Sequence, residues 1–168
     1  ILNLLYRKEG HRVGTEGGQD YDFGVLIRLT EKITSYRWSV PEKKTKLLEL
    51  LDLNLIPGVM RAREIGDSMY DSVYSFVEGG NAGSLSKITD EVRNDIAFKT
   101  SVIPQFERFC SALSDVTSLE ESVLMSLTDD EDDEDFSDFE IEKAELNACV
   151  SRCRELKDST EFVIRGGD

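Results

Sequence analysis

Carboxylates crowd one short part of this chain. Residues 129–145 contain eleven aspartates and glutamates and a single base, Lys143, which gives this stretch a net charge of −10. The whole chain has a net charge of −14, so all other residues together carry only −4. Concentrated negative charge attracts cations and basic protein surfaces, and it repels the phosphates of nucleic acids and the headgroups of anionic lipids. The sequence therefore favours a basic protein partner over direct binding to nucleic acid or membrane.

Two phenylalanines, Phe136 and Phe139, interrupt the acidic run. An aromatic ring beside flexible carboxylates suits a basic surface, because the charge speeds the encounter and the ring fills a pocket that sets the register. The residues predicted to contact such a partner are Asp132, Asp133, Glu134, Asp135, Phe136, Asp138 and Phe139. The alternative is a solubilising linker between two helices, in which both phenylalanines pack back on the helices.

The same acidic run partly matches a calcium-binding loop. The residues that would fall on ligand positions of an EF-hand are Asp129, Glu131, Asp133, Asp135 and Glu140. Glu134 occupies the place where glycine makes the sharp turn of such loops, and Phe136 follows where an aliphatic residue is usual. A degenerate, calcium-responsive loop is therefore an alternative to partner binding.

Pairs of carboxylates one helical turn apart suggest an enzymatic alternative. Such pairs hold Mg²⁺ in all-α nucleotide pyrophosphohydrolases, and here they are Asp67 with Asp71 and Glu91 with Asp95. Each pair lies beside or opposite the apolar stripe of its own helix, as do the adjacent glutamates 120 and 121. This placement is typical of solvent-exposed helix faces, so no metal site is predicted.

Other reactive groups are sparse. His11 is the only histidine and lies in a glycine-rich loop, residues 9–20, whose part from Gly14 to Gly18 lacks the ending of a phosphate-binding loop. The three cysteines, Cys110, Cys149 and Cys153, have no disulfide or zinc spacing and are predicted to be buried small apolar residues. We therefore predict no catalytic residue, no cofactor and an intracellular location, cytoplasmic or nuclear.

The apolar residues recur at helical spacing, and strand patterns are nearly absent. We predict an all-α, antiparallel helical bundle of about five to six helices with an acidic, flexible loop before the last helix. Residues 1–128 would form the bundle, residues 129–140 the acidic segment, and residues 141–168 a final helix with a short tail. Within the bundle, an interruption is expected at 54–58 near Pro57, and a shorter helix is expected from Ser84 or Ser86 through Ile96. The tail from Thr160 is expected to be frayed or a short strand.

The function that these features favour is a non-enzymatic helical adaptor or regulatory domain whose acidic and aromatic segment binds a basic protein. A charge mimic of nucleic acid is a weaker alternative, because the acidic residues lie in one stretch of sequence and are not spread over a surface.

Overall fold

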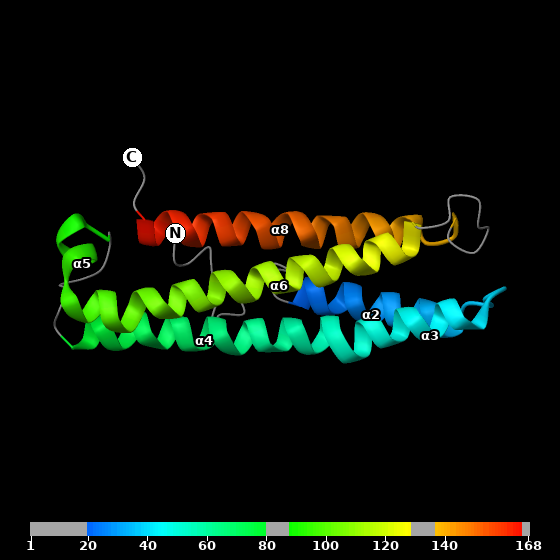
Figure 1. Cartoon of the computed structure of the whole chain (residues 1–168), viewed down its shortest axis with the longest axis horizontal. Helices are drawn as coiled ribbons and strands as arrows, with labels where there is room; N and C mark the ends of the chain where they lie inside the picture. The colour runs from blue at the N-terminus through cyan, green and yellow to red at the C-terminus, as the bar shows by residue number, and fades with distance from the viewer. Residues whose placement is uncertain (1–19, 80–87, 129–136, 166–168) are drawn as a thin grey trace.

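The helices of this chain pack into an elongated antiparallel bundle (Figure 1). The structure is a computed structural model and describes residues 20–79, 88–128 and 137–165. In chain order the helical elements are α2 (Asp20–Ser35), α3 (Pro41–Glu49), η1 (Leu50–Leu55), α4 (Ile56–Glu78), α5 (Asp90–Asn94), η2 (Phe98–Val102), α6 (Ile103–Thr128) and α8 (Glu140–Arg165). The described ranges contain no strand, and the predicted all-α bundle is confirmed.

Three long rods set the shape of the bundle. The elements α3, η1 and α4 form one rod, α6 runs back along it, and α8 runs antiparallel to α6 (Figure 1). The shorter α2 packs on α3 and α8, so it lies over only one half of the length. At the other end, α5 and η2 connect back into α6.

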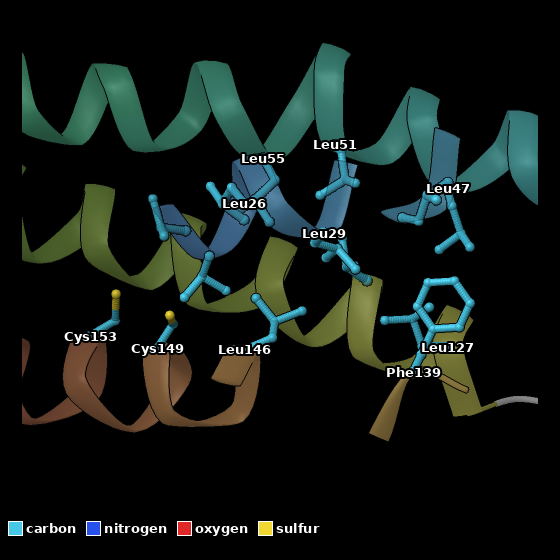
Figure 2. Close-up of a cluster of buried hydrophobic side chains, with 14 of the residues drawn as sticks. Leu26, Leu29, Leu47, Leu51, Leu55, Leu127, Phe139, Leu146, Cys149 and Cys153 are labelled. Atoms are coloured by element: carbon cyan, nitrogen blue, oxygen red, sulfur yellow. The ribbon is translucent and has the colours of Figure 1, made fainter. Parts of the chain in front are cut away.

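The core follows the apolar spacing of each helix. In α2, Val25, Leu26, Leu29 and Ile33 are all buried, which is the three-and-four spacing of one helix face. These side chains meet leucines of α3 and η1 and the first half of α8 in one cluster (Figure 2). A second cluster, centred on Phe98 and other aromatic side chains, fills the half of the bundle near α5.

The expected interruption at 54–58 is wrong, because the chain stays helical through it. The wider π-helical turn η1 ends at Leu55, two residues before Pro57, and η2 stands in the same relation to Pro104. Proline lacks an amide N–H and its ring clashes with the carbonyl four residues earlier, and a wider turn moves that carbonyl away. The side chain of Asn54 donates a hydrogen bond of 3.2 Å to the carbonyl of Glu49, which helps to satisfy the displaced backbone.

Two other expected boundaries also differ. The tail is helical to Arg165 and buries Thr160 and Val163, because the apolar spacing of α8 continues past residue 160. The short helix before η2 spans Asp90–Asn94, and Ile96, the last residue of the expected helix, is 79% exposed. The expected start at Ser84 or Ser86 lies outside the described residues. The backbone at Asp95 is extended, which ends α5 and turns the following residue outward.

Small residues let α4 approach α6 closely. Gly58, Ala62 and Gly66 recur one turn apart on α4, and Ala62 and Gly66 are buried. A Cβ on Gly58 would lie 3.0 Å from Cδ1 of Leu119, and one on Gly66 would lie 3.1 Å from Cε2 of Phe109. Both glycines therefore allow contacts between α4 and α6 that a larger side chain would obstruct.

The two glycines should respond differently to alanine. Each substitution gains up to about 1 kcal/mol of helix propensity. Leu119 is only partly buried and ends in a flexible group, so Gly58→Ala should raise the free energy of unfolding. Phe109 is a rigid ring in the core, so Gly66→Ala should leave the protein about 1–2 kcal/mol less stable than Gly58→Ala. Urea unfolding of the two variants measures this difference, and equal stabilities would show that the Phe109 ring yields freely.

The described helices include none that is both long and apolar enough to cross a membrane. All three cysteines are buried, as the sequence predicted.

Candidate functional site

The acidic segment is anchored at its C-terminal end by Phe139. Its side chain is 0% exposed and points into the core between α2, α6 and α8 (Figure 2). The ring contacts Tyr36 edge-on at 5.2 Å between centroids and stacks on Trp38 at 5.4 Å. Phe139 was predicted to contact a partner, but in this structure it is an internal anchor, because the apolar pocket at the end of α2 already surrounds it.

Lys32 of α2 covers this anchor. Its ammonium lies 4.9 Å from the centroid of the Phe139 ring, which is a cation–π contact. The same nitrogen donates hydrogen bonds to the backbone carbonyl of Asp138 and, at 2.8 Å, to Oε2 of Glu142. Lys32 therefore fixes both the end of the acidic segment and the first turn of α8.

A second base of α2 extends the contact along α8. Arg28, one turn before Lys32, pairs with Glu145 at 2.9 Å, and Glu145 lies one turn beyond the position of Glu142. The Lys32–Glu142 pair is better shielded from solvent than the Arg28–Glu145 pair. The side chain of Glu142 is 13% exposed, whereas that of Arg28 is 51% exposed. Both bases that face the start of α8 are thus already engaged by carboxylates within the chain.

These contacts define where the acidic segment is attached. It leaves α6 after Thr128 and rejoins the described chain at Ser137, at the end of the bundle where α6 and α8 meet (Figure 1). Asp138 is exposed there. The other predicted contact residues, Asp132, Asp133, Glu134, Asp135 and Phe136, lie outside the described residues, as do most of the calcium-ligand positions. The last of those positions, Glu140, pairs with Lys143 at 2.7 Å.

The structure does not bring together the carboxylates of the enzymatic alternative. Asp67, Asp71 and Glu91 are exposed, and Oδ1 of Asp95 accepts a hydrogen bond of 3.0 Å from the backbone N–H of Phe98. Asp95 therefore caps the helical residues 96 and 97 that lead into η2. Within the described ranges, no group of three or more histidine, cysteine, aspartate or glutamate side chains is placed to hold a metal ion.

One carboxylate differs from the sequence prediction. Glu120 is 2% exposed, whereas the sequence predicted a solvated helix face for it and its neighbour. It takes a place in the core stripe of α6 between Val116 and Val123, and Glu121 points outward to hydrogen-bond Arg154 of α8. The sequence did contain a signal for the burial of Glu120, because position 120 continues the three-and-four spacing of the buried residues of α6.

A second polar feature lies between α6 and α8 around Cys110. Burial raises the pKa of the Cys110 thiol, and the negative charge of Glu161 raises it further. The thiol is therefore held in its neutral, poorly nucleophilic form. The surrounding groove of about 370 Å³ is lined by both acidic and basic groups, and its acid Glu161 pairs on α8 with Arg165 at 3.3 Å and with Lys157 at 3.8 Å.

Comparison of the chain with protein-family models, with curated proteins and with solved structures gave no match.

Proposed function

We propose that this chain is a non-enzymatic helical interaction domain that presents its acidic segment, residues 129–140, to a basic surface of another protein. The observation that carries the proposal is the anchored end of the segment. The buried ring of Phe139 and its cover by Lys32 hold one end of an acidic run against a rigid bundle. This attachment keeps the acidic segment at one end of the bundle, where a partner that docks on that end would contact it.

The local charge balance supports the same proposal. Residues 129–135 are seven consecutive acidic residues. The two nearby bases of α2, Arg28 and Lys32, already pair with Glu145 and Glu142 of α8. An external basic surface would therefore relieve repulsion between neighbouring carboxylates, and binding would be driven by long-range attraction.

The burial of Phe139 decides which residues of the segment remain to contact the partner. Phe139 is committed to the core, so the contacts to the partner are assigned to Asp132, Asp133, Glu134, Asp135, Phe136 and Asp138. Phe136 is the one aromatic side chain of the segment left for a pocket on the partner.

Salt dependence tests the proposal, with core histone dimers as a basic protein probe. We expect tight binding at low salt that weakens by at least tenfold as ionic strength rises from about 0.01 M to about 0.15 M, because the Debye length falls from roughly 30 Å to roughly 8 Å. Isothermal titration calorimetry at the two salt concentrations measures this. Binding that does not change with salt would mean that charge attraction is not its basis.

A further inference from the structure

A groove between α4 and α6 has the opposite electrostatic character to the acidic segment. It has a volume of about 430 Å³ and runs along the end of the π-helical turn η1 and the first part of α4. On the rod formed by α3, η1 and α4, the lining of the groove extends from Leu53 to Ile65, which is roughly 18 Å at 1.5 Å per residue. This length corresponds to about three turns of a helix.

Two arginines line this groove from its two sides, Arg61 on α4 and Arg108 on α6. Both are exposed. Neither forms an ion pair with any residue in the described ranges, and the one hydrogen bond of Arg108 is a long one, 3.4 Å to the side chain of Gln105. The groove lining contains these two arginines and one carboxylate, Asp115, and neither arginine forms an ion pair with it, so both guanidinium groups remain available to bind carboxylates of a ligand.

The rest of the groove lining is mostly apolar, with two neutral polar residues, Asn54 and Ser111, and one acid, Asp115. Its apolar lining includes Leu53, which is 72% exposed, and Ala112 and Leu119. Asp115, which also lines the groove, lies about two turns along α6 from Arg108 and would repel a carboxylate at that end. A ligand that fits must therefore combine an apolar side chain with carboxylates placed toward the two arginines.

We propose that this groove docks an acidic, amphipathic peptide segment of a partner protein, with its carboxylates on Arg61 and Arg108 and an apolar side chain against Leu53 and Leu119. Guanidinium groups bind carboxylates through two parallel hydrogen bonds, which gives orientation as well as attraction. The open, elongated shape suits a peptide lying along the two helices. This surface is separate from the acidic segment and selects the opposite charge, so it goes beyond the function proposed above.

The test uses fluorescein-labelled amphipathic peptides with leucine at the apolar positions and glutamate, glutamine or lysine at the polar positions. We expect the glutamate peptide to bind at least tenfold more tightly than the glutamine peptide, as followed by fluorescence anisotropy. ¹H–¹⁵N spectra should place its binding at Ser111 and Ala112 of the groove. The preference runs against the net charge of −14, which by itself would favour the lysine peptide.

Variants locate the effect. The double variant Arg61→Glu with Arg108→Glu should abolish the preference for glutamate, and it should fold because both side chains are exposed and form no ion pair in the described structure. Arg37→Glu, also an exposed arginine but outside the groove lining, should leave the preference intact. Asp115→Asn should tighten binding of the glutamate peptide. The proposal is overturned if the glutamate peptide fails to bind, if it binds no better than the glutamine peptide, or if the double variant keeps the preference.

Discussion

Replacing Phe139 by alanine should lower the free energy of unfolding by about 3–5 kcal/mol, the range for truncating a fully buried aromatic side chain. The ring has no exposed surface and contacts both Tyr36 and Trp38, so the space it leaves cannot be filled by solvent or by a small shift of one neighbour. The cation–π contact with Lys32 is lost as well. Such a loss is a large fraction of the stability of a typical domain.

Phe162→Ala is the matched control for this prediction. It makes the same chemical change on α8, the helix that Phe139 directly precedes, but the side chain of Phe162 is 57% exposed. Its effect should stay within about 0.5 kcal/mol, as expected for most surface positions. Urea unfolding measures both variants. If the two substitutions cost the same, Phe139 does not anchor the acidic segment to the bundle.

Neutralising the acidic segment should reduce affinity for core histone dimers by about 100-fold at low salt, because charge complementarity sets both encounter and register. The substitutions are Asp132→Asn, Asp133→Asn, Glu134→Gln and Asp135→Asn, which keep the size of each side chain and remove its charge. The loss should shrink as salt is raised, since screening already weakens the same attraction in the unmodified protein.

A control variant separates the position of the charge from its amount. Four exposed acidic residues lie on the rod formed by α3, η1 and α4, namely Glu42, Glu49, Asp52 and Glu64. Neutralising these four also changes the net charge from −14 to −10 but leaves the acidic segment unchanged. Affinity should then fall much less. Equal losses in the two variants would mean that only total charge matters, and no loss in the first would exclude the segment as the binding site.

The sequence was sufficient for the class of fold because the apolar stripes are long. Leu26, Leu29 and Ile33 show the spacing that fixes one face of α2, and the structure buries all three. The error at Pro57 arose from treating proline as the end of a helix. A π-helical turn before it relieves the clash within the rod, and this depends on how the rod packs on α6 rather than on local preference.

The candidate site was harder to predict than the fold. The sequence offered two environments for Phe139, an exposed anchor or a buried one, and only the meeting of α2 with the start of α8 decides between them. The groove at Arg61 and Arg108 was not predicted at all. These residues are 47 positions apart in the sequence, so their common surface depends on the relative register of two packed helices.

A ¹H–¹⁵N NMR titration of the labelled chain with core histone dimers tests the proposed function most directly. We expect the amide signals of residues 129–138 to shift or broaden as the dimers are added, and the signals of α4 to remain unchanged. A parallel titration with Ca²⁺ should leave the flanking helices unaffected. Changes confined to the helical surfaces, or ordering of the segment by Ca²⁺ alone, would contradict the account in which the acidic segment binds a basic protein.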